Sequence, residues 1–417
     1  MTDGTALALE AKALDAADPL AAFRTRFIGH GDPAIPAYLD GNSLGRPLKA
    51  TAGRLQDFLC SQWGGRLIRG WDEGWLALPE RLGDELGEVA LGAAAGQCIV
   101  ADSTTVLLYK LARAAVAARP DRREIVLDAD NFPTDRYVME GIARECGLSL
   151  RWVPANYDGG VSAEAVAAAV GPETALAVFS HVAYRSGYLA DAAAVTEIVH
   201  AAGGLVLWDL CHSVGVVPAE LDTWQVDYAV GCSYKYLNGG PGAPAWAYVA
   251  RRHQADFAQP IQGWLGSADP FGMGQGYVPA EGIRRLASGT PPVLGMLAMQ
   301  DMTALIREAG GVAAVRAKSV ALTDFAVRAV DSLLAPHGVV LASPRSSAER
   351  GSHVTIDHPA FKTVTDSLWS RGIIPDYRNP AGIRLGLSPL STSFGETFTG
   401  ISAVLAELTE LAELAGL

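Results

Sequence analysis

Between residues 125 and 249 the sequence alternates short, uninterrupted apolar runs with segments of helical periodicity. Helices are expected near 134–146, after the cap Ser162 and after the cap Asp191. Strands that are apolar along their whole length are typical of parallel sheets covered by helices on both faces. The pattern therefore predicts an α/β fold on a mostly parallel sheet. The expected strands are 125–128, 148–153, 174–180, 205–209, 227–232 and 245–249.

Two of these runs end in residues that suit one cofactor. Asp209 closes the run 205–209, and Lys235 follows the run 227–232. Ligands in open α/β sheets bind at the carboxyl ends of strands. A lysine can form a Schiff base with pyridoxal phosphate (PLP), and a carboxylate can pair with its pyridinium nitrogen. Either residue alone would be interpreted as a solvated loop residue, but together they predict a PLP site.

Three further segments could complete such a site. Ser103-Thr104-Thr105 precedes a helical run, and a helix N-terminus offers amides to a phosphate, although an ordinary N-cap is the alternative. Phe132 follows a strand and could stack on the cofactor ring, with a core phenylalanine as the alternative. His212 could orient Asp209 or contact the phosphate, with simple packing as the alternative.

An amino-acid substrate would bring a carboxylate, which arginine binds through two parallel hydrogen bonds. Arg384 lies inside an expected strand, where a solvated arginine is unusual, and Arg378 is the competing candidate. A structural ion pair is the alternative for both.

The length of the chain, 417 residues, exceeds a typical single core and predicts two domains. Residues 1–50 are expected to form an N-terminal arm packing with the small domain. Residues 51–295 are expected to form the large cofactor-binding domain, and 296–417 a smaller C-terminal α/β domain. The remaining expected elements are helices at 6–26, 293–306, 312–334 and 396–414 and strands at 353–356 and 382–387.

Composition excludes several classes of function. The net charge of −12 argues against nucleic acid and anionic membranes as partners. The five cysteines, expected to be small buried residues, form no CxxC pair, so neither a disulfide framework nor a metal site is predicted. The chain has no secretory signal and no apolar stretch long enough to span a membrane, so we expect a cytoplasmic location.

Several blocks of sequence resemble the kynureninase family, within the aminotransferase-like (fold type I) PLP enzymes, over nearly the whole chain. The segments around Asp209 and Lys235 would fit many enzymes of this fold, and the other blocks make the resemblance more specific. The blocks are YLDGNSLG at 38–45, WDEGW at 71–75, FPTD at 132–135, WDLCHS at 208–213, GCSYKYLNGGPG at 231–242, Gly263-Trp264, GTPP at 289–292 and RGSHV at 350–354.

The resemblance implies a large domain with a mostly parallel seven-stranded sheet and a smaller C-terminal α/β domain. It implies a PLP-dependent hydrolase of the kynurenine pathway. Such an enzyme cleaves the β–γ carbon bond of L-kynurenine, 3-hydroxykynurenine or another ring-substituted derivative. The products are anthranilate, or 3-hydroxyanthranilate, and L-alanine.

The resemblance also implies roles for the matching residues. Lys235 would carry the cofactor, Asp209 would pair with the pyridinium nitrogen, and Tyr234 would act as a proton donor. Two residues of a neighbouring subunit, Trp264 and Thr290, would reach the phosphate, which implies a homodimer. The remaining cofactor contacts would come from Thr104, Thr105, Phe132, Asp135, Ser180, His212 and Tyr234.

On the substrate side, Arg384 would hold the α-carboxylate, with Ser43 and Trp71 nearby. This sequence departs from the family pattern here. Ser391 stands where the family usually has a tyrosine, and the segment 71–75 lacks a histidine that some relatives have. Both departures leave the ring substituent of the substrate open.

Two other PLP enzyme classes share the implied fold. A cysteine desulfurase or selenocysteine lyase uses a catalytic cysteine far along the chain, but no cysteine follows Cys232 here. An aminotransferase would use a second, 2-oxo acid substrate. A non-catalytic PLP-fold regulator is the alternative outside enzymes, but the chain has no basic patch or fused DNA-binding segment.

Overall fold

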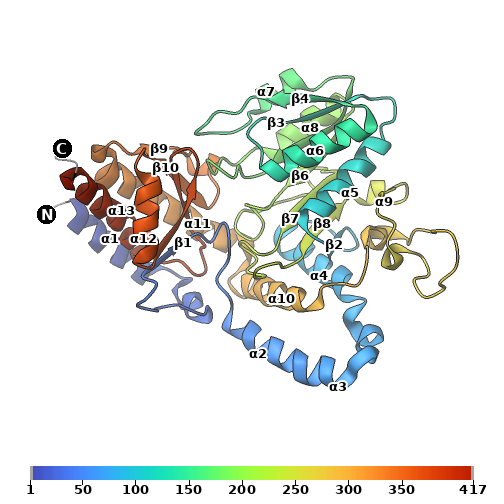
Figure 1. The fold of residues 1–417 in the computed structure, drawn as a ribbon, viewed down its shortest axis with the longest axis horizontal. Coiled ribbons are helices and arrows are strands. Elements are labelled where there is room, and N and C mark those ends of the chain that lie inside the picture. Colours follow the sequence, from blue (N-terminus) through green and yellow to red (C-terminus); the bar gives the residue numbers. More distant parts are fainter. Residues whose placement is uncertain (1–2, 415–417) are drawn as a thin grey trace.

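The large domain is built on a seven-stranded sheet in the order β2-β8-β7-β6-β5-β3-β4. All neighbouring strands run parallel except at β8, which is antiparallel to both β2 and β7. The computed structural model describes residues 3–414 (Figure 1). The strands are β2 (Cys98–Ala101), β3 (Glu124–Asp128), β4 (Ser149–Val153), β5 (Thr174–Ser180), β6 (Leu205–Asp209), β7 (Tyr228–Cys232) and β8 (Ala245–Val249).

Side chains that alternate along each strand build a core on either face of this sheet. In β6, Val206 and Trp208 pack in one cluster, while Leu205 and Leu207 pack in the other. The first cluster holds α4 (Leu78–Leu86), α7 (Ala163–Ala169), α8 (Ala192–Ala201) and α10 (Val293–Glu308). The second cluster holds α5 (Thr104–Ala117) and α6 (Pro133–Cys146). Burial on both faces explains why these strands are apolar throughout.

A second, five-stranded sheet forms the smaller domain, in the order β1-β11-β12-β10-β9. The N-terminal strand β1 pairs parallel with β11, so residues from both ends of the chain share this sheet. The strands are β1 (Ala37–Leu39), β9 (Val340–Leu341), β10 (His353–Asp357), β11 (Ile373–Arg378) and β12 (Gly382–Gly386). The helices around it are α1 (Asp3–Ala17), α11 (Gly311–Ala329), α12 (Phe361–Ser370) and α13 (Phe394–Leu414).

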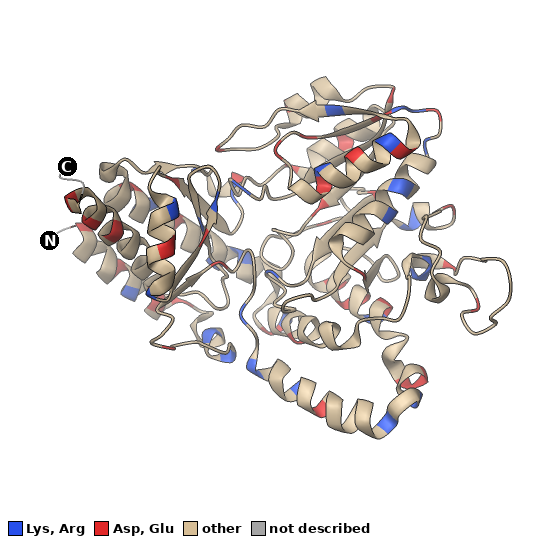
Figure 2. Cartoon of the chain, in the orientation of Figure 1, with Lys and Arg blue, Asp and Glu red and all other residues tan. Residues whose placement is uncertain are grey.

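The remaining helices are short or lie outside the two sheets. Helices α2 (Lys49–Asp57) and α3 (Gly64–Arg66) form an arm along one side of the large domain (Figure 1). Helix α9 (Arg251–Gln254) follows β8. Basic and acidic residues are interspersed over both domains (Figure 2). Within residues 3–414, no helix combines the length and apolar character that crossing a membrane requires.

The fold class expected from the sequence is confirmed, and some details were wrong. The helix expected at 6–26 ends at Ala17, because Pro19 follows and cannot continue it. The strands β1, β2, β9 and β11 were not predicted. Cys60 is exposed on the α2–α3 arm and Cys146 is half-buried, so not all cysteines are buried. The domain division at 295/296 stays a prediction, and the packing of α10 with the large domain favours a later one.

Candidate active site

The side chain of Lys235 lies buried beyond the carboxyl end of β7. Its Nζ is 3.1 Å from Nε2 of His212 and 5.7 Å from the centre of the Phe132 ring. Burial, and then the nearby Lys235 charge, lower the pKa of His212 well below its usual value. A neutral imidazole can accept a hydrogen bond from the Lys235 ammonium. The structure therefore brings Lys235, His212 and Phe132 together from three separate segments.

A pair of carboxyl groups lies beside this lysine. Asp209 ends β6, and its Oδ1 accepts a 2.6 Å hydrogen bond from the amide of Cys211. Asp135, in the first turn of α6, is 1% exposed, and its Oδ2 has no hydrogen-bond partner. Burial, and then the adjacent Asp209 carboxylate, raise the pKa of Asp135 well above its usual value. A buried acceptor without a donor suits a ligand that brings an N–H or O–H group.

The Asn131 amide gives a second buried polar atom without a partner. Its Oδ1 accepts hydrogen bonds from Ser180 Oγ at 2.8 Å and from the Phe132 amide at 2.7 Å. Its Nδ2 has no hydrogen-bond partner. The unpaired donor of Asn131 and the unpaired acceptor of Asp135 fit a flat polar ring such as that of PLP.

The N-terminus of α5 follows β2 at the same edge of the sheet. Ser103 caps the helix by accepting a hydrogen bond from the Val106 amide, and Thr104 and Thr105 begin its first turn. The first amides of a helix have no partner within the helix and attract anions. This end of α5 therefore has the chemistry that a phosphate requires.

Arg384 lies on β12 of the small domain and is 1% exposed. It forms an ion pair with Asp376, donates to the Tyr184 carbonyl at 2.6 Å and donates to Ser43 Oγ at 2.9 Å. Arg378 donates to the same Asp376 carboxylate at 2.8 Å. The sequence left a structural ion pair as the alternative role of Arg384 and Arg378, and both arginines form such a pair with Asp376. The contacts of Arg384 use four of its five guanidinium N–H groups, so a carboxylate that is held through two parallel hydrogen bonds would displace one of them.

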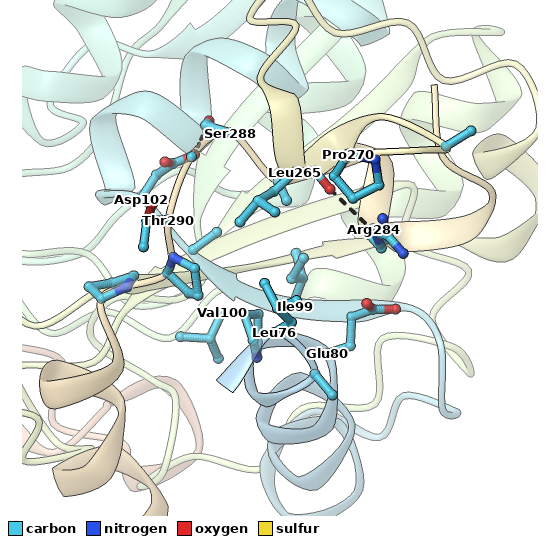
Figure 3. A pocket seen from close by; sticks show the side chains of 18 of the residues that line it. Leu76, Glu80, Ile99, Val100, Asp102, Leu265, Pro270, Arg284, Ser288 and Thr290 are labelled. Carbon is cyan, nitrogen blue, oxygen red and sulfur yellow. Dashed lines mark hydrogen bonds between the residues drawn. The ribbon is translucent and has the colours of Figure 1, made fainter. Parts of the chain in front are cut away.

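Three of the expected site residues lie in other surroundings. Trp71 packs edge-on against Trp75, with ring centres 5.2 Å apart, beside the large-domain core. Trp264 and Thr290 are exposed in the described chain. Thr290 lines a cavity of about 410 Å³ that contains neither Lys235 nor Asp209 (Figure 3). The roles expected for these three residues stay predictions.

Sequence reasoning missed several residues of this region. The His353 ring lies 5.8 Å from that of His212, and the Tyr184 ring meets Phe132 edge-on at 5.4 Å. His353 stands in the RGSHV block, which was a usable signal. Nothing in the sequence around Tyr184 or Asp376 indicated a contact with Phe132 or Arg384. No cluster of side chains within residues 3–414 could hold a metal ion.

The sheet order and the polar residues at its carboxyl edge define the aminotransferase-like, fold type I class. Two solved structures have a similar fold. A mutant of the cystine lyase C-DES, with glycine linked to its PLP cofactor, has a TM-score of 0.80 and 18% identity over 93% of this chain and 99% of that one. The cysteine desulfurase CsdA of Escherichia coli has a TM-score of 0.77 and 18% identity over 95% and 98%. At this identity the likeness shows the fold alone.

Sequence relatives are more specific. A kynureninase of Burkholderia pseudomallei is 42% identical over 407 residues, which covers 95% of this chain and 94% of the relative. A kynureninase of Pseudomonas fluorescens is 41% identical over 409 residues with the same coverage. Residues 315–404 match the kynureninase C-terminal domain. The chain belongs to the kynureninase family.

Proposed function

We propose that the protein is a PLP-dependent hydrolase that cleaves L-kynurenine, or a ring-substituted derivative such as 3-hydroxykynurenine, into an anthranilate and L-alanine. The relatives named kynureninase at 41% to 42% identity support the reaction. Within the structure, the proposal depends on the group formed by buried Lys235, buried His212 and half-buried Phe132, which lies beside Asp209 and the unpaired oxygen of Asp135. The alternatives, a cysteine desulfurase or an aminotransferase, are not favoured by these relatives.

We assign the following roles at the cofactor. Lys235 would hold it covalently, Asp209 would bond the ring nitrogen, and Phe132 would stack on the ring. The first turn of α5 is suited to the phosphate, because the first amides of a helix have no partner within the helix and the helix N-terminus is positive. The other residues proposed to contact the cofactor are Thr104, Thr105, Asp135, Ser180, His212 and Tyr234.

The bound cofactor would supply a sink for the electrons that remain when a bond to the substrate α-carbon breaks. Lys235 would take the α-proton as the general base. Water would add to the side-chain ketone, and the β–γ carbon bond would break so that the acyl group leaves as anthranilate. Tyr234, the residue before Lys235, would then give a proton to the β-carbon, which leaves as part of L-alanine. Arg384 would orient the substrate through its carboxylate, helped by Ser43, which already contacts the guanidinium at 2.9 Å.

We also propose a homodimer in which Trp264 and Thr290 complete the neighbouring subunit's site. Their exposure supports this proposal, because both are available to a second copy. Trp71 is proposed to border the substrate ring. The cytoplasmic location and the pathway served stay predictions.

The test is the release of a fluorescent anthranilate. Purified protein with PLP should release anthranilate from kynurenine, and a parallel assay with 3-hydroxykynurenine would give the ring preference. Addition of 2-oxo acids should not be required. A spectral change on adding amino acids without any anthranilate product would contradict the proposed reaction.

A further inference from the structure

Lys110 is a lysine buried in the large domain at 0% exposure, on the second turn of α5. An ammonium group has three protons, and here each has an acceptor. Nζ donates to Asp102 Oδ2 at 2.6 Å, to the Leu286 carbonyl at 2.7 Å and to Ser288 Oγ. Burial lowers the pKa of Lys110, and Asp102 opposes that effect. The ammonium therefore joins two segments that are far apart in the sequence, the turn at Asp102 before α5 and the stretch from Leu286 to Ser288.

One of these segments leads directly into the proposed phosphate site. Asp102 has a φ of +45°, a left-handed conformation that is unfavourable for a residue with a side chain. Its carbonyl accepts a hydrogen bond from the Ala245 amide of β8 at 3.0 Å. The next residues are the cap Ser103 and then Thr104, which begins α5. The bond from Lys110 to Asp102 thus stabilises the turn that sets the direction of the first helical amides.

Another segment leads to the residues proposed to reach a neighbouring subunit. Ser288 Oγ donates to Asp102 Oδ2 at 3.0 Å, and the Ser288 carbonyl accepts from the Leu265 amide at 3.2 Å. A Cβ at Gly263 would lie 2.1 Å from that carbonyl oxygen, so the chain before Trp264 packs tightly on Ser288. Thr290 lies two residues after Ser288 in the sequence. Figure 3 shows Asp102, Ser288 and Thr290 close together on one wall of the cavity.

We propose that Lys110, Asp102 and Ser288 form a positioning unit that holds the N-terminus of α5 and the Trp264 and Thr290 segments in register for phosphate binding. None of the three is proposed to touch the phosphate. The inference rests on the proposed function, in which Thr104 and Thr105 serve the cofactor of their own subunit and Trp264 and Thr290 serve the other. One buried ammonium would then link two phosphate sites across the dimer.

A positioning role and a purely structural role of this ion pair predict different effects on ligand binding. If it positions the phosphate ligands, its loss should weaken the binding of PLP but not that of pyridoxal, which has the same ring without the phosphate. If the unit only stabilises the domain, its loss should weaken the binding of both ligands equally or leave both unchanged. The ratio of the two dissociation constants therefore separates the two roles.

The experiment uses Lys110→Met, which keeps an unbranched side chain and removes the charge. Lys362→Met, at an exposed lysine of α12, is the matched control. Each protein is freed of cofactor, and the dissociation constants of PLP and pyridoxal are measured by titration of tryptophan fluorescence. We expect the constant for PLP to rise about 10- to 100-fold in Lys110→Met, and that for pyridoxal to stay within about threefold. The control should match wild type.

A second variant guards against misfolding. Ser288→Ala removes one acceptor and leaves the ion pair, so it should fold and raise the PLP constant by several-fold, about the effect of one hydrogen bond. The positioning role would be overturned if the variants bound PLP and pyridoxal equally more weakly than wild type. It would also be overturned if PLP binding were unchanged both in Ser288→Ala and in folded Lys110→Met protein. A wild-type protein that binds no PLP would instead overturn the proposed function.

Discussion

One buried aspartate at the amino edge of the large sheet and two at its carboxyl edge have opposite surroundings. Asp227 comes just before β7, and both its oxygens are occupied. They accept hydrogen bonds from the Val206 amide at 2.8 Å and Arg252 at 2.6 Å, and they contact His200 at 2.8 Å and His253 at 2.6 Å. Burial alone would raise the pKa of Asp227, but the histidine hydrogen bonds outweigh it and lower the pKa well below its usual value.

At the carboxyl edge, the pair of Asp209 and Asp135 has no such set of partners. Asp209 accepts one backbone hydrogen bond, and Asp135 keeps an oxygen with no partner and a raised pKa. A saturated buried carboxylate stabilises the fold, whereas an unsaturated pair lowers stability unless a ligand completes it. The difference separates the edge that holds the sheet together from the edge proposed to bind the cofactor.

The largest effect is expected at Lys235. Lys235→Ala removes the proposed covalent link and the proposed base, so kcat/KM for kynurenine should fall by at least about 10³-fold. The melting temperature of the cofactor-free protein should change little. Lys362→Ala is the control at an exposed lysine. Retention of activity within tenfold of wild type would exclude Lys235 from the chemistry.

At the opposite edge, Asp227→Asn should affect stability and not chemistry. The variant keeps the shape but leaves Arg252 without its charged partner. The free energy of unfolding should fall by about 2 kcal/mol, the order expected when hydrogen bonds to a buried charged group are weakened, since Arg252 itself is 39% exposed. Urea denaturation of the cofactor-free protein measures this. Asp209→Asn is the matched change one strand away and should lower activity with little loss of stability. A loss of activity without a loss of stability in Asp227→Asn, together with a loss of stability in Asp209→Asn, would contradict these roles of the two edges.

The pH dependence follows from the two directions of pKa shift. The pKa of Asp227 is lowered in the folded protein, so its contribution to stability is present above the unfolded pKa of about 4. It is lost as the pH falls through the lower, folded pKa. Wild type should therefore lose stability on acidification more steeply than Asp227→Asn. Denaturation midpoints between about pH 6 and pH 3 measure this. Parallel curves would show that Asp227 is not the responsible group.

The smallest effect, of opposite sign, is expected at Asp135. Its raised folded pKa means that it lowers stability at neutral pH and that stability is lost as the pH rises through that pKa. Asp135→Asn should therefore stabilise the cofactor-free protein by about 1 kcal/mol while weakening PLP binding. The unfolding midpoint and the PLP dissociation constant, each measured for the variant and for wild type, test this prediction. A variant less stable than wild type would show that the carboxyl group is well accommodated.

Much of the fold could be predicted because its signals are local. The runs that became β5, β6 and β8 match their predicted bounds, since strands buried on both faces are apolar throughout. Lys235, Asp209 and Phe132 stand at strand ends, where the sequence marks a change from apolar to polar. Short edge strands such as β9 have too few residues to show the alternation of apolar and polar side chains that identifies a strand in the sequence.

Contacts that depend on tertiary packing could not be predicted. Lys110 looks in the sequence like an ordinary helix lysine, yet its partner Ser288 is 178 residues away. Asp376 reaches Arg384 only because β11 and β12 are antiparallel neighbours. The proposed contacts of Trp264 and Thr290 need a second subunit, which no pattern within one chain describes.

The most direct test of the cofactor site is chemical trapping followed by peptide mapping. Wild-type protein is incubated with PLP, reduced with borohydride and digested, and the modified peptide is identified by mass spectrometry. We expect one pyridoxyl-phosphate adduct, on Lys235, which is absent in Lys235→Ala. An adduct on another buried lysine such as Lys110, or no adduct in wild-type protein saturated with PLP, would contradict it.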